Sequence, residues 1–246
     1  MGLTKRGFWC KITVSNDLGK GAIPMKKVTN GLEFSLLDGG VAVLEGFGCC
    51  ELEHIVVPAM IGGFPVVGVA EKAFCRSEQL RSIFFPASVR FVDAQAFAWC
   101  RNLEKVIFDG VLELGERAFM GCDNLSSVVL GGELEIIGEK AFAYCPALEA
   151  LILPDSVTSI GEAAFEGCRN LRSIDISDNV KVIENGTFYA CGSLRQIKLP
   201  RRLEYIDEFS FAYCISIKEM LIPSRTVLNH DAFLGCGTLH RSHAVG

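Results

Sequence analysis

Large hydrophobic residues recur along most of the chain at a fixed spacing. The most regular of them are the phenylalanines Phe74, Phe97, Phe119, Phe142, Phe165, Phe188, Phe211 and Phe233. Successive members of this series are 23, 22, 23, 23, 23, 23 and 22 residues apart. A constant period in the range of about 20–50 residues is typical of solenoids, in which no repeat can bury its own apolar face. The pattern therefore predicts a stack of repeats.

Within one repeat, the spacing of apolar residues predicts a strand and a return segment. In the repeat that starts at Phe165, the apolar positions are Cys168, Leu171, Ile174, Ile176, Val180 and Ile183. Alternation between Ile174 and Ile176 is the two-residue period of a strand. Pro154 and Pro200 directly follow their strands and would end them, because proline cannot donate a ladder hydrogen bond.

The last segment of each repeat reads Ile-Gly-Glu-x-Ala-Phe and predicts a short helical turn. Acidic residues open this turn, as Glu116, Glu139 and Glu162 do. A carboxylate there would complement the free N–H groups of a helical start. The other interpretation of these acidic residues is a metal-binding column.

Stacking of eight such repeats at about 4.8 Å per strand predicts a parallel sheet about 35–40 Å long. The pattern L-x-x-I-x-L-P-x-x-V-x-x-I-G-x-x-A-F-x-x-C, which residues 148–168 match nearly throughout, resembles the BspA-like class of leucine-rich repeat. The resemblance covers about residues 34–240. It implies an α/β solenoid with a parallel strand sheet on the concave face and short helical turns on the other side. Many members of the class are bacterial or protist surface proteins regarded as binding host or partner proteins.

The resemblance also divides the chain into segments. Residues 1–33 match no part of the pattern and are interpreted as a poorly ordered or accessory segment. Residues 34–72 would form an N-terminal cap hairpin and a divergent first repeat. Residues 73–240 would form the leucine-rich repeats, and residues 241–246 would form a tail.

Charge and hydropathy exclude some classes of function. The formal net charge of -5 and the pI of about 5.5 argue against nucleic-acid binding, which normally requires a basic face. The most apolar region, residues 55–70, is broken by proline and glycine, so membrane insertion is not expected. The first thirty residues lack the apolar stretch of a secretory signal. We expect a cytoplasmic protein on that ground, or, from the family resemblance, a surface or secreted protein whose signal was removed.

The chain has eleven cysteines, a high count, and seven of them are periodic: Cys100, Cys122, Cys145, Cys168, Cys191, Cys214 and Cys236. Three interpretations of this column stay open, namely structural thiols, disulfides between repeats and a metal site. A line of single cysteines lacks the converging pairs of a zinc site, and an odd total does not favour a disulfide framework. No HExxH, GxSxG or P-loop motif occurs. We therefore predict no catalytic residue, no metal and no cofactor, and no enzyme.

One column of the predicted strands points to solvent and is apolar over its first half. Its members are Val56, Phe84, Ile107, Val129, Ile152, Asp175, Lys198 and Leu221, of which all but Leu221 are predicted to bind a partner. A solvated strand face normally carries polar residues at such positions. The apolar half therefore predicts an interface, unless it reflects only the preference of β-branched residues for strands.

These observations favour a non-enzymatic protein-binding module that uses the concave strand face. The first alternative is a structural or adhesive segment of a bacterial or protist cell-surface assembly. A thiol-redox protein is the remote alternative, kept because of the cysteines. A protein partner of unknown identity is expected, with self-association through the apolar column or the C-terminal edge as a further option.

Overall fold

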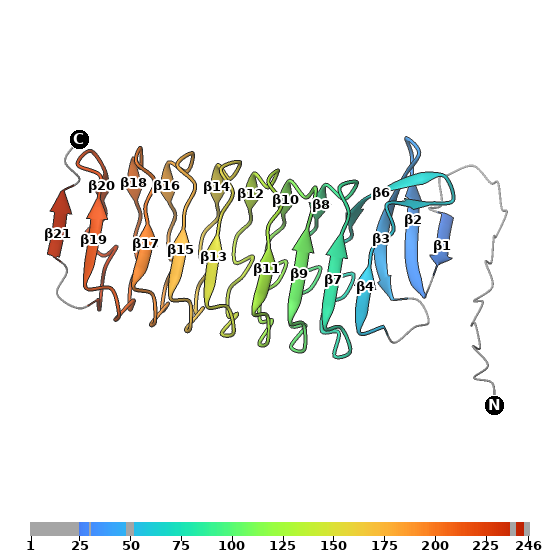
Figure 1. The fold of residues 1–246 in the computed structure, drawn as a ribbon, viewed down its shortest axis with the longest axis horizontal. Helices are drawn as coiled ribbons and strands as arrows, with labels where there is room; N and C mark the ends of the chain where they lie inside the picture. The colour runs from blue at the N-terminus through green and yellow to red at the C-terminus, as the bar shows by residue number, and fades with distance from the viewer. Residues whose placement is uncertain (1–24, 30, 48–51, 237–239, 244–246) are drawn as a thin grey trace, which may run out of the picture.

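The computed structural model describes residues 25–29, 31–47, 52–236 and 240–243. Figure 1 shows an elongated stack of coils that runs from a hairpin near the N-terminus to the red strands near the C-terminus. We name each coil by its repeat phenylalanine. All regular elements in the described residues are β-strands, and none of these residues forms a helix that could cross a membrane.

An antiparallel cap covers the N-terminal end of the stack. β1 (Met25–Thr29) pairs with β2 (Leu32–Leu37), which pairs with β3 (Val41–Phe47). The cap sheet therefore begins at Met25, ahead of residue 34, where the sequence pattern placed it; residues 1–24 lie outside the described ones. β3 continues into the solenoid by pairing in parallel with β6 (Phe64–Val69).

Each coil contributes a longer strand to one face, which we call the long-strand face. These strands are β4 (His54–Val56), β7 (Ser82–Phe85), β9 (Lys105–Phe108), β11 (Ser127–Val129), β13 (Ala150–Ile152), β15 (Ser173–Asp175), β17 (Gln196–Lys198), β19 (Glu219–Ile222) and β21 (His240–His243). All pairs between them are parallel, as the 23-residue pattern predicts.

Strands of two residues, together with the longer β6, form a second face, which we call the short-strand face. It begins at β6, with β5 (Met60–Ile61) paired to it, and continues with β8 (Phe91–Val92), β10 (Glu113–Leu114), β12 (Ile136–Ile137), β14 (Ser159–Ile160), β16 (Val182–Ile183), β18 (Tyr205–Ile206) and β20 (Val227–Leu228). The result is a parallel β-solenoid of about eight turns.

The long-strand face is not the single continuous sheet that the repeat pattern predicts. Its pairing runs through β4-β7-β9-β11, then β13-β15-β17, then β19-β21. Within the described residues no pairing joins β11 to β13 or β17 to β19. The short-strand face pairs across both of these junctions and is interrupted at β14 and β16 instead. Neighbouring coils therefore stay paired on at least one of the two faces.

The predicted short helical turns are wrong, and the described residues contain strands and turns only. Around each repeat phenylalanine from Phe74 to Phe211, residues four positions apart are left-handed, as at Lys140 (φ 54°) and Tyr144 (φ 57°). A right-handed helix cannot continue through such residues. Every second backbone N–H group in this segment donates to the next coil. The N–H of Phe142 donates to the carbonyl of Ala164 (2.8 Å), and the N–H of Tyr144 donates to the carbonyl of Glu166 (2.6 Å). The segments therefore stack as a ladder of turns.

The repeat phenylalanines form the axis of the core. All of them from Phe74 to Phe211 are buried, at 2% exposure or less, and Phe233 is partly buried. Neighbouring rings in this column are stacked, with centroids 5.0–5.6 Å apart and interplanar angles of 2–11°. At the N-terminal end, Phe47 of the cap meets Phe74 edge to face at 4.9 Å. The cap thus covers the first ring of the column.

Candidate functional site

The residues predicted to face outward lie in register on the long-strand face. Val56 pairs with Phe84, Phe84 with Ile107, and Ile107 with Val129. In the next ladder, Ile152 pairs with Asp175 and Asp175 with Lys198. The interruption between β11 and β13 separates Val129 from Ile152 in the pairing. The column is therefore in two parts. The first runs from Val56 to Val129 through three paired junctions, and the second runs from Ile152 to Lys198 through two.

Side chains of this column are exposed because their strand neighbours point inward. Val56 is 73% exposed, whereas Ile55 beside it is 3% exposed. Ile152 is 74% exposed and Val129 is 49% exposed, and Phe84 and Ile107 are partly buried. Asp175 and Lys198 are exposed as well. Exposure of apolar area to water is unfavourable. Covering this column with another surface would therefore lower the free energy of the system.

A polar column runs beside the apolar one. His54 Nδ1 and Ser82 Oγ are 2.8 Å apart in adjacent strands. Arg81, just before β7, forms ion pairs with Glu104 (2.8 Å) and Glu53 (3.4 Å). These groups are exposed, and such ion pairs add little stability because water screens them. Their place beside the apolar side chains resembles the polar rim of an interface.

The periodic thiols are buried and hydrogen-bonded to the preceding coil. From Cys100 to Cys214 they are 0% exposed, and each donates to a phenylalanine carbonyl, at 3.0–3.2 Å. The carbonyl of Phe165, for example, accepts the N–H of Cys168 (3.2 Å) and the thiol of Cys191 (3.1 Å). The column thus links each coil to the next, a role that the sequence pattern did not reveal.

Burial raises the pKa of Cys100 to about 12 and raises the pKa of Cys122, Cys168 and Cys191 well above the ordinary value. Reactive cysteines have the opposite environment, since activation requires exposure and a lowered pKa. The described cysteines are all free, and no group of three or more potential metal ligands converges within the described part of the chain. The column therefore has the environment of structural thiols.

We expect the buried thiols to resist alkylation in the native protein. At neutral pH, Cys75, which is partly exposed, should be modified by iodoacetamide well before Cys145, Cys168 or Cys191. Peptide mapping after timed labelling measures the order, and labelling in denaturant supplies the control in which all three react. Rapid native modification of these cysteines would contradict the burial of the column.

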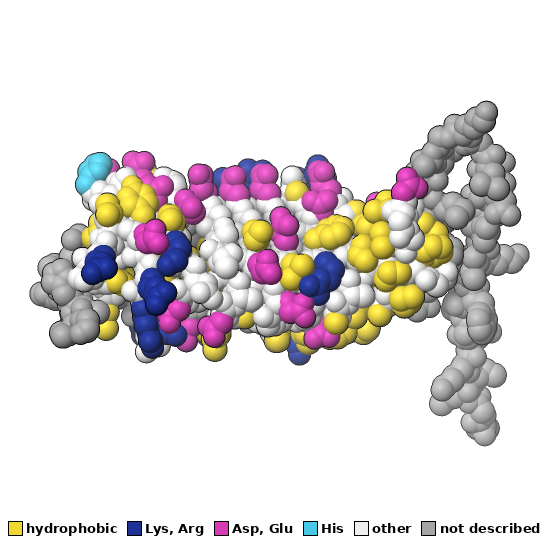
Figure 2. Space-filling model, turned by 90° about the horizontal axis from the view of Figure 1, so that it is seen from above, with side chains coloured by type: hydrophobic (Ala, Val, Ile, Leu, Met, Phe, Trp, Pro, Cys, Tyr) yellow, Lys and Arg dark blue, Asp and Glu magenta, His cyan; other side chains and the backbone are white. Residues whose placement is uncertain are grey.

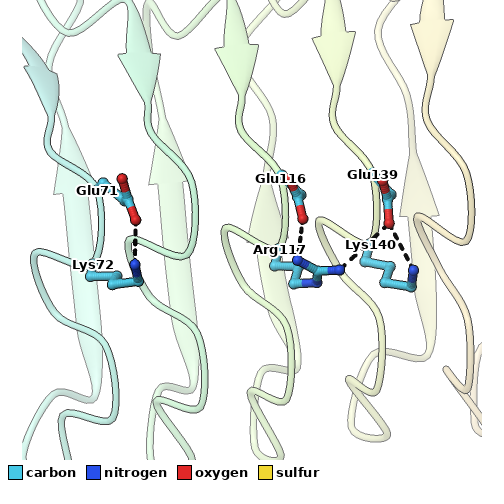
Figure 3. A network of polar contacts seen from close by, with 6 residues as sticks. All are labelled: Glu71, Lys72, Glu116, Arg117, Glu139 and Lys140. Carbon is cyan, nitrogen blue, oxygen red and sulfur yellow. Dashed lines mark hydrogen bonds and ion pairs between the residues drawn. The ribbon is translucent and has the colours of Figure 1, made fainter.

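Acidic residues at the turn edge pair with basic residues. Figure 3 shows Glu116 and Arg117 in contact, with Glu139 between Arg117 (3.7 Å) and Lys140 (2.7 Å). Lys140 and Arg117 hold the pKa of the Glu139 carboxyl below its ordinary value. Because no helix starts here, the predicted role at a helical N-terminus does not apply. In Figure 2, acidic side chains line up along one long edge of the molecule.

The sequence pattern missed a hollow on the long-strand face between β17 and β19. Its volume is about 530 Å³, and its lining comes from both strands, with Asp175 and Arg195 beside them. Ile197 is partly exposed there, whereas the equivalent Ile174 one coil earlier is fully buried. The interruption of the ladder thus opens the face in the C-terminal half.

Comparison with known proteins agrees with this geometry. The family model described as the BspA type leucine rich repeat region matches residues 45–134 and 112–240, with six copies. The crystal structure of the T. pallidum leucine rich repeat protein is 30% identical, with a TM-score of 0.72, and the match covers 77% of this chain and 89% of that one. A Bacteroides ovatus leucine-rich repeat protein is 25% identical, with a TM-score of 0.63 over 82% and 60% of the two chains.

No curated protein matches the chain. The family match nevertheless spans most of the described solenoid, and the structural match to the T. pallidum protein extends over nearly all of that relative. The repeated phenylalanine and cysteine columns that define the coils lie inside the matched residues. The chain therefore belongs to the BspA type leucine-rich repeat family.

Proposed function

We propose that the protein is a non-enzymatic binding module whose long-strand face takes a protein partner on the apolar column from Val56 to Ile152. The fold is that of a protein-interaction or surface repeat module. Solenoids of this kind present extended surfaces made from equivalent residues of successive repeats. The proposal assigns the binding role to one such column.

The observation that carries the proposal is the exposure of Val56 and Ile152, each about three-quarters accessible to water. Covering a valine or isoleucine side chain completely contributes about 1.5–3 kcal/mol. The preference of β-branched residues for strands explains their presence in a sheet, but a polar β-branched residue such as threonine would satisfy it equally well. Asp175 and Lys198 would then lie at the rim of the contact.

The double substitution Ile107→Lys with Ile152→Lys tests the proposal. We expect the fold to survive, because both side chains point outward, and we expect partner binding or self-association to be lost. Circular dichroism and thermal unfolding report the fold, and sedimentation and pull-down report association. Ile136→Lys with Val227→Lys is the matched control, since these residues are 38% and 61% exposed on the short-strand face.

Three outcomes would overturn the proposal. Unfolding of the Ile107→Lys, Ile152→Lys protein would show that these side chains support the core. Unchanged association of the folded variant would show that the apolar column reflects strand preference alone. Equal loss of binding in the control would show that any added positive charge disturbs the contact.

A further inference from the structure

The junction between β17 and β19 lacks the backbone hydrogen bonds that close its neighbours. At the preceding junction, the N–H groups of Arg195 and Gln196 both donate to the carbonyl of Arg172, at 3.1 Å. One coil later, within the described residues, the carbonyl of Arg195 accepts no such bond from Lys218 or Glu219. Strand edges with free N–H and C=O groups are templates for pairing with another chain.

The open edges line the hollow, and its floor is apolar. Gln196, Ile197 and Lys198 form one wall, and the first three residues of β19 form the other. Met220 is 3% exposed, and Ile197 is partly accessible. The volume of about 530 Å³ falls within the range of about 300–1,000 Å³ that binding sites for small ligands occupy. An extended backbone between the two strands would meet the free edge of each.

Three basic residues lie in or next to the lining of the hollow, namely Arg195, Lys198 and Lys218, against two acidic ones. Arg195, Lys198 and Lys218 are exposed, and none of them lies in an ion pair with a described residue, whereas Arg172 pairs with Glu149 at 3.4 Å. The acidic side chains in the lining are Asp175 and Glu219. Figure 2 shows basic side chains gathered toward the C-terminal end of the stack.

We infer that this hollow binds an extended acidic peptide segment of a protein partner by strand addition. The segment pairs its backbone with the free edges of β17 and β19, and its carboxylates face Arg195, Lys198 and Lys218. Strand addition of this kind draws affinity from main-chain hydrogen bonds and specificity from the side chains on either side. The inference rests on the proposed function in one respect, since it places the partner on the same face, and it adds the chemistry of the partner.

Three synthetic heptapeptides test the inference by calorimetry at about 0.15 M salt. The first alternates glutamate and valine, the second is its fully N-methylated form, and the third replaces glutamate with lysine. We expect saturable binding of the first and none of the other two. N-methylation keeps the charge and removes the donors, so equal binding of the second peptide would overturn strand addition. Absence of binding by the first would overturn the site.

Charge reversal at the rim tests where the peptide binds. Arg195→Glu with Lys198→Glu should weaken binding about tenfold to a hundredfold, because attractive charges become repulsive ones. Lys105→Glu is the matched control on the same face, at β9, where the ladder is closed, and it should leave the affinity unchanged. Equal weakening by Lys105→Glu would show a diffuse charge effect and overturn the assignment. Unfolding of the double variant would leave the three peptides as the deciding comparison.

The apolar-column variant Ile107→Lys, Ile152→Lys separates the two proposals. It should bind the glutamate–valine peptide as the unmodified protein does, because neither residue lines the hollow. Loss of partner binding together with retained peptide binding supports both proposals. Retained partner binding overturns the role of the apolar column alone, and loss of peptide binding in this variant overturns the placement of the peptide in the hollow.

Discussion

Phe165→Ala should lower the free energy of unfolding by about 3–5 kcal/mol, the usual cost of removing a buried phenylalanine side chain. Phe165 is fully buried and stacks on Phe142 (5.6 Å) and on Phe188 (5.5 Å), with interplanar angles of 4° in both pairs. The substitution leaves a cavity at the centre of the stack and removes both ring contacts at once. Because each coil in a solenoid contacts only its neighbours, coupling between the two halves should weaken as well.

Urea denaturation followed by circular dichroism measures the effect. Phe84→Ala is the matched control, since it removes the same side chain from the partly exposed column of the long-strand face. It should cost about 1 kcal/mol, because surface changes are small beside core truncations. A broadened or two-step transition in Phe165→Ala, absent from Phe84→Ala, would report the uncoupling. Equal losses in the two variants would contradict the assignment of the ring column as the core.

Gly46→Ala should cost about 2–6 kcal/mol and loosen the cap from the first coil. Gly46, in β3, has φ +132°, a conformation that side chains rarely adopt, and a Cβ there would lie 2.1 Å from the carbonyl oxygen of Ala73. That oxygen belongs to the backbone and cannot rotate away. Backbone strain costs about 1–3 kcal/mol, and overpacking of a tight contact costs about as much again.

Gly39→Ala isolates the strain from the steric contact. Gly39 has φ +97° in the hairpin of the same cap, but nothing lies within 4 Å of the position that its Cβ would take. Hydrogen exchange in β2 and β3 should increase much more in Gly46→Ala than in Gly39→Ala. If the two substitutions cost the same, the contact between Gly46 and Ala73 does not hold the cap in place.

The burial pattern was predictable because it depends on which side chains are apolar and how far apart they stand. Phe165 and Ile174 occupy the core for that reason, and Ile152 points outward because it lies between two inward residues. The turns were not predictable in the same way. Left-handed positions usually select glycine, yet Trp99 (φ 62°) and Tyr144 (φ 57°) occupy them here. Stacking of neighbouring coils supplies the hydrogen bonds that compensate for this strain.

The interruptions of the long-strand ladder were also beyond the sequence pattern, since every coil repeats the same apolar positions. The charges just before the strands do not mark them either. Arg81 and Glu104 alternate in sign from coil to coil and form an ion pair at 2.8 Å. In the later coils the equivalent positions are Arg172, Arg195 and Lys218, all positive. Arg172 and Arg195 are like charges at the paired junction β15/β17, however, and Ser126 and Glu149 stand at the unpaired junction β11/β13, so the interruptions do not follow the charges.

The alternation of paired junctions between the two faces has a mechanical consequence. The stack is not a uniform rod, because at the junctions β11/β13, β14/β16 and β17/β19 strand pairing joins the coils on one face only, beside the ladder of turns. We expect bending that opens the unpaired face to be easiest at these junctions, and its sense should change from one to the next because the unpaired face alternates.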